Sequence, residues 1–229
     1  MMRRITAFAI GLTFVSYAAH AQTNQDALTR MIVTSANGVL DSMMRTLNDR
    51  TLDFNTHIEA INKTRPLEVK NLDSVHIGAN VSSTLEFIEY LKQFRASGEK
   101  IIHRFEDSLF VLQSEFPPVR EKMLIKGVAD SYMADNKAFD KYVAALSKIY
   151  SQVLNVLLFL QHTPFAIVKG APQFHSANDV AAYRKMMTQV DQAQAEAAKA
   201  TVASRKASTF AHKKLQEFNT AETNRTSKP

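Results

Sequence analysis

The stretch that decides the fold is residues 128–160, which read VADSYMADNKAFDKYVAALSKIYSQVLNVLLFL. Its large apolar side chains recur in steps of three, four and seven residues, a spacing that places them on one face of an α-helix. The members of this stripe are Val128, Tyr132, Phe139, Tyr142, Val143, Leu146, Ile149, Tyr150, Val153 and Leu157. No glycine or proline interrupts the stretch. We therefore predict one long amphipathic helix that opens near Pro118, includes this stripe and ends before Pro164.

The same period recurs in three other segments, at residues 25–62, 82–114 and 176–218. Pro66 closes the first, and Gly98 lies inside the second, where it weakens the helix locally. Ser176, followed by Asp179, resembles a capping box at the start of the last segment. Helices of about 50–65 Å with one apolar face cannot fold alone. We predict an all-α fold, an antiparallel up-down-up-down four-helix bundle of long helices; an extended array of helical hairpins is the alternative.

The N-terminal residues predict export. Arg3 and Arg4 precede a short apolar run at residues 5–16, and Ala19 and Ala21 form an A-x-A cleavage site. This pattern is typical of a secretory signal peptide, and the run is too short to cross a bilayer. We expect a signal peptide at 1–21, a bundle at 22–218 and a disordered polar tail at 219–229. The expected location is the periplasm of a Gram-negative bacterium, or release from the cell, without a transmembrane span after cleavage.

The amino-acid composition and the motifs that are missing exclude several classes of function. The chain has no cysteine, so packing alone must stabilise an exported fold. The net charge is +6, and residues 177–229 hold nine basic and five acidic residues, which concentrates the surplus there. Export argues against nucleic acid as a partner. The sequence contains no G-x-S-x-G, H-E-x-x-H, phosphate-binding glycine loop or C-x-x-C-H motif, so we expect neither an enzyme nor a cofactor.

The two longer connections resemble each other at an offset of 99 residues, which is consistent with a duplicated helical hairpin or with chance. Lys70 then matches Lys169, and His76 matches His175. In an up-down-up-down bundle these connections lie at the same end, where the four residues would form a weakly basic, pH-sensitive cap. Such a cap could receive a carboxylate, a phosphate or an acidic partner. The alternative is that they are ordinary solvated loop residues.

Two helix surfaces are candidate interaction sites. Residues 153–160 are apolar on almost every side, so Leu158 and Phe159 must be covered by a loop or by another chain. Lys199, Lys206 and Lys213 recur every seven residues and form one basic stripe. This stripe could contact an anionic envelope surface or could simply be solvated.

One cluster has metal-ligand spacing. Glu99, His103 and Glu106 share a helix face that could hold one divalent ion, but the face continues a polar stripe. We interpret this helix face as solvent-exposed and predict no metal site.

We predict a non-enzymatic binding or scaffold module of the cell envelope, whose partner is another envelope protein or a second copy. The alternatives are a sensor-like module that binds a small anion at the loop-bearing end, and a chaperone-like or envelope-surface binder that uses the basic last helix.

Overall fold

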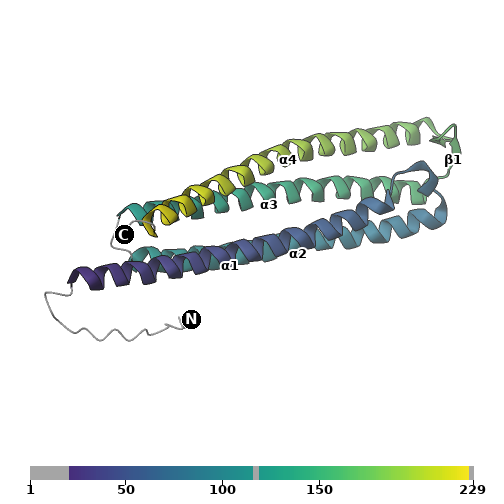
Figure 1. Ribbon diagram of the computed structural model, residues 1–229. Helices are drawn as coiled ribbons and strands as arrows, with labels where there is room; N and C mark the ends of the chain where they lie inside the picture. Colours follow the sequence, from purple (N-terminus) through teal and green to yellow (C-terminus); the bar gives the residue numbers. More distant parts are fainter. Residues whose placement is uncertain (1–20, 116–118, 227–229) are drawn as a thin grey trace, which may run out of the picture.

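The computed structural model describes residues 21–115 and 119–226. Four long helices lie side by side and alternate in direction along the chain (Figure 1). They are α1 (Ala21–Thr64), α2 (Ser74–Glu115), α3 (Val119–His162) and α4 (Ala177–Thr226). The predicted all-α helical bundle is confirmed. The expected signal peptide lies outside the described residues except for Ala21, at which α1 begins.

Two helix bounds differ from those expected. α2 begins at Ser74, eight residues before residue 82, because Asp73 caps its first turn and Ile77 anchors that turn in the core at 2% exposure. α4 continues through Thr226 instead of ending at 218. The residues after Phe218 are polar, but none before Thr226 is glycine or proline, so nothing local stops the helix. The tail that we expected to be disordered is therefore helical over residues 219–226.

Both longer connections lie at the same end of the bundle (Figure 1), as the predicted topology requires. The first contains a short 3₁₀ turn, η1 (Val69–Asn71). The second is a β-hairpin of β1 (Phe165–Val168) and β2 (Ala171–Phe174), which pair antiparallel. Its two turn residues, Lys169 and Gly170, have φ angles of 51° and 77°. A two-residue hairpin turn with both angles positive is the type I′ turn, whose twist suits the flanking strands.

The core consists of three clusters arranged along α3, which packs against both α2 and α4. The first cluster joins α1, α3 and α4 through Leu40, Met43, Ile125, Val128, Ala129, Tyr132, Ala211 and Phe218. The second, here called the aromatic cluster, joins α1, α2 and α3 through Phe54, Ile61, Phe87, Leu91, Phe94, Val143, Leu146 and Tyr150. The third lies at the loop-bearing end, with Leu72, Ile77, Val153, Val156, Leu157, Leu160 and Val190. α3 contributes to all three clusters, whereas α4 contributes nothing to the aromatic cluster.

The segment Ile125–His162 of α3 is also long and apolar enough to cross a membrane, judged by length and composition alone. The central helix of a bundle meets the same criterion. Here the segment supplies buried side chains to each of the three clusters. Of its most apolar part, 33% is buried inside the bundle.

Candidate functional site

The loop-bearing end contains a pocket of about 520 Å³ between the first connection, the end of α3 and β1. Its wall includes Lys70, Asp73, His162, Phe165 and Ile167. Of the four predicted ligand-binding residues, only Lys70 lines it. The others, His76, Lys169 and His175, are exposed outside the pocket.

Carboxylates that the sequence analysis did not consider offset the predicted basic cap. The Nζ atom of Lys70 lies 3.3 Å from Oε1 of Glu68. Nδ1 of His76 lies 2.5 Å from Oδ2 of Asp73. Lys70 and His76 therefore each lie beside a carboxylate, and Glu68 is also 3.5 Å from Arg65, so a free anion would compete with both carboxylates.

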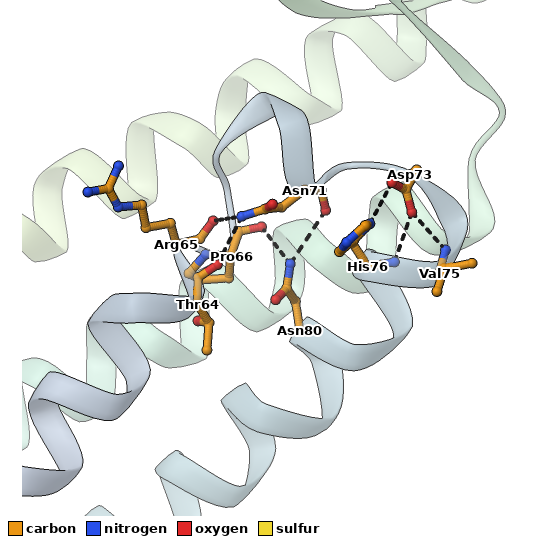
Figure 2. A network of polar contacts seen from close by, with 8 residues as sticks. All are labelled: Thr64, Arg65, Pro66, Asn71, Asp73, Val75, His76 and Asn80. Atoms are coloured by element: carbon orange, nitrogen blue, oxygen red, sulfur yellow. Dashed lines mark hydrogen bonds and ion pairs between the residues drawn. The ribbon is translucent and has the colours of Figure 1, made fainter.

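The first connection is held by side-chain amides (Figure 2). The Nδ2 atom of Asn71 donates to the carbonyl oxygens of Thr64 and Arg65 at 3.0 and 3.1 Å, which closes the C-terminal end of α1. Asn80, which is buried, donates to the carbonyl oxygens of Pro66 and Asn71 at 3.3 and 3.4 Å. The bonds from Asn71 give donors to carbonyls at the end of α1, and those from Asn80 give donors to carbonyls within the connection. The connection is thus a fixed structure rather than a loose loop.

Asp73 is the N-cap of α2. One carboxylate oxygen, Oδ1, accepts hydrogen bonds from the backbone N–H groups of Val75 and His76 at 3.1 and 2.9 Å (Figure 2). The bond from the His76 backbone and the bond from its side chain hold the pKa of Asp73 below its usual value. An aspartate just before an apolar helical period is a recognised start signal. This helix start is not evident from the sequence, because Gly78 and Asn80 in the first turns of α2 are residue types typical of loops.

The lowered pKa of Asp73 predicts a contribution to acid sensitivity. A carboxyl whose pKa is depressed on folding stabilises the protein above its unfolded pKa, about 4, and this contribution is lost as the pH falls through the folded pKa. The Asp73→Asn variant keeps a side-chain oxygen that can cap the helix, but its amide has no carboxyl proton to titrate at acidic pH. We expect the unfolding free energy of the wild type to fall more steeply below about pH 5 than that of Asp73→Asn. Urea denaturation over a pH series measures this, and parallel curves would contradict it.

The apolar run at residues 153–160 is covered mainly by the chain itself. Val153, Val156, Leu157 and Leu160 are buried in the third cluster. Phe159 packs on the hairpin, with its ring centroid 5.5 Å from that of Phe174. Leu158 is 37% exposed. The predicted apolar interaction surface is therefore reduced to one partly exposed leucine.

The predicted basic stripe on α4 is exposed, and it includes apolar residues. Lys199, Val202, Lys206, Phe210 and Lys213 follow one another in steps of three, four, four and three residues. At 3.6 residues per turn they fall within an arc of about 80°. All five are exposed, and Val202 and Phe210 are each 52% exposed. We call these five residues the α4 outer face.

The α4 outer face lies opposite the side of the helix that packs on the bundle, where Ala197 and Ala211 are buried. No acidic residue occurs between Ala197 and Gln216. The nearest acidic residues on α4 have other partners, since Glu196 pairs with Lys148 and Glu217 with Lys214, both at 2.7 Å. Val202 and Phe210 continue the apolar period of the last helix, but they lie between the lysines on its exposed side.

A buried arginine in the middle of the bundle was not anticipated. Arg50, on α1, is 9% exposed. Its guanidinium donates to Oδ1 of Asn136 at 3.0 Å and to the carbonyl oxygen of Phe94 at 2.7 Å, and it lies 4.0 Å above the Phe94 ring. Burial lowers the pKa of Arg50 from its ordinary value, and Asp140 opposes that shift. Within the described ranges, Nε of Arg50 has no hydrogen-bond partner.

On the polar face of Glu99, His103 and Glu106, two of the three side chains contact each other within α2. Nδ1 of His103 lies 3.1 Å from Oε2 of Glu106, on the exposed side of α2. Among the described residues, no group of three or more histidine, aspartate or glutamate side chains is placed to hold a metal ion. His103 and Glu106 thus form a side-chain contact within one turn of α2.

Comparison of the chain with models of protein families, with curated proteins and with solved structures found no match in any of the three.

Proposed function

We propose that the protein is an exported, non-enzymatic helical-bundle module of the cell envelope that binds an anionic lipid surface through the α4 outer face. The observation that carries the proposal is the exposure of three lysines and two apolar side chains on one side of α4. The signal-peptide pattern at residues 1–21 supports the envelope location. The lack of cysteine fits an exported fold that depends on packing.

The shape of this face suits a flat, negatively charged surface. From Lys199 to Lys213 the helix advances about 21 Å, so the charges form a line rather than a pocket. Each lysine near an anionic bilayer contributes about 1 kcal/mol, and this attraction weakens as salt is added. Val202 and Phe210 can enter the headgroup layer between the lysines. Two apolar residues are too few to bury the helix deeply, so the module would lie on the membrane surface.

The other surfaces support binding less well. The loop-end pocket offers a cation, but Lys70 already has Glu68 at 3.3 Å. Self-association through the apolar run would have to rest on Leu158, since Phe159 is packed on the hairpin. We therefore place the functional surface on α4.

Removing the three lysine charges is expected to abolish most membrane binding. For Lys199→Gln/Lys206→Gln/Lys213→Gln we expect a loss of affinity on the order of 100-fold, since three contributions of about 1 kcal/mol disappear together. The measurement is cosedimentation of the purified exported protein with vesicles of equal parts phosphatidylglycerol and phosphatidylethanolamine. Pure phosphatidylcholine vesicles are the uncharged reference. Added salt should weaken wild-type binding steeply.

A charge-matched control separates the α4 outer face from overall charge. Lys63→Gln/Lys100→Gln/Lys141→Gln removes three exposed lysines from α1, α2 and α3. We expect this variant to bind the anionic vesicles nearly as well as the wild type. Equal losses in the two triple variants, or equal wild-type binding to both kinds of vesicle, would refute the proposal. Binding to an acidic protein but not to vesicles would likewise refute the lipid assignment.

A further inference from the structure

A second feature of the bundle, independent of the α4 outer face, is a polar cavity of about 370 Å³ between α1, α3 and α4. It lies where α4 contributes no side chain to the aromatic cluster. At this level α4 presents Ser204 and Ser208, both half-buried, where a bundle helix would normally present large apolar residues. The wall also includes Leu47, Arg50, Asp135, Phe139 and Arg205.

The charge of this cavity comes from two arginines. Arg50 is more than nine-tenths buried and forms part of the wall. A guanidinium carries five N–H donors, but the two hydrogen bonds of Arg50 to Asn136 and Phe94 use one donor at Nη1 and one at Nη2. Its Nε atom is buried and has no partner within the described residues. Arg205 is exposed and lines the same cavity from α4.

One carboxyl lines the same cavity as these cations. Asp135, which is half-buried, lines the cavity, and burial raises its pKa while His212 opposes that shift. Asp140, the other acid near Arg50, is engaged by Arg95, whose Nε and NH2 atoms each lie 3.2 Å from its oxygens. The cavity therefore combines two permanent positive charges with one carboxyl. This balance favours a ligand with a single negative charge over a doubly charged one.

We propose that this cavity is a binding site for a small monocarboxylate. The carboxylate would lie between Arg50 and Arg205, since guanidinium groups match the planar geometry of a carboxylate. The hydroxyls of Ser204 and Ser208 supply further donors, and Leu47 and Phe139 supply an apolar wall for the remainder of the ligand. A ligand of this kind would add a carboxylate acceptor for the guanidinium donors of Arg50 that its bonds to Asn136 and Phe94 leave unused.

The test uses lactate as the probe, with acetate, phosphate and chloride compared at matched ionic strength. Isothermal titration of the purified protein is expected to show saturable binding of lactate. Arg205→Gln removes one cation at an exposed position and is expected to weaken lactate binding at least about tenfold, the loss of one charge-assisted hydrogen bond. Arg184→Gln removes an exposed arginine that does not line the cavity. We expect it to bind lactate as the wild type does.

A second variant tests the cavity without changing charge. Ser208→Leu fills space from the half-buried face of α4 and is expected to abolish lactate binding while circular dichroism still reports a folded helical protein. Three results would overturn the proposal: no saturable lactate binding by the wild type, equal affinities for Arg205→Gln and Arg184→Gln, or phosphate binding more tightly than lactate.

Discussion

Phe54→Ala is expected to lower the free energy of unfolding by about 3–5 kcal/mol, the cost of removing a large aromatic side chain from a packed core. Phe54 is 2% exposed. Its ring centroid lies 5.2 Å from that of Phe94 on α2 and 5.1 Å from that of Phe139 on α3. The side chain thus joins three helices at one point. Urea denaturation followed by far-ultraviolet circular dichroism measures the loss.

The matched control is Leu52→Ala, two residues away on the same helix. Leu52 is 69% exposed, so its removal leaves no cavity. We expect a change within about 0.5 kcal/mol, as for other surface substitutions. Similar losses for the two variants would show that Phe54 does not join the helices as described. The aromatic cluster would then not be the centre of the bundle.

The aromatic cluster was largely predictable from sequence because it follows the helical period. Phe54, Phe94 and Phe139 each lie on a stripe that spacing alone identifies, and all three pack together. The bounds of the connections were less predictable. Asp73 and Asn71 act by hydrogen bonds across the first connection, and such bonds leave no periodic pattern. Polar composition alone also gave no basis for extending α4 to Thr226.

The candidate sites also differ in how far the sequence predicts them. The lysines of the α4 outer face repeat every seven residues, which predicts one shared face, and the structure exposes all three. The Arg50 site was missed, although a signal was present. Arg50 occupies the stripe position between Leu47 and Phe54, and Asn136 occupies the one between Tyr132 and Phe139. A polar residue that interrupts an apolar stripe indicates a buried polar contact, but its partner is known only from the fold.

Gly98→Ala is expected to destabilise the protein by about 2–4 kcal/mol, although alanine is the better helix former by about 1 kcal/mol. A Cβ atom at Gly98 would overlap the guanidinium of Arg50. The guanidinium would have to leave its bonds to Asn136 and to the Phe94 carbonyl, each worth about 1.5–3 kcal/mol for a charged donor. Gly38→Ala is the control, since nothing lies within 4 Å of its added Cβ. Urea denaturation should show Gly38→Ala to be stabilising by up to about 1 kcal/mol.

A second substitution, at Arg50, tests whether the guanidinium causes the destabilisation expected for Gly98→Ala. Arg50→Met removes the guanidinium and its charge while keeping a long, flexible side chain. In that background the added Cβ meets no guanidinium, so Gly98→Ala should become neutral or stabilising by up to about 1 kcal/mol. A reversal of sign between the two backgrounds would identify Arg50 as the reason that glycine occupies this position. The same loss in both backgrounds would instead assign the effect of Gly98 to the packing of α2, and Arg50 would then have no part in it.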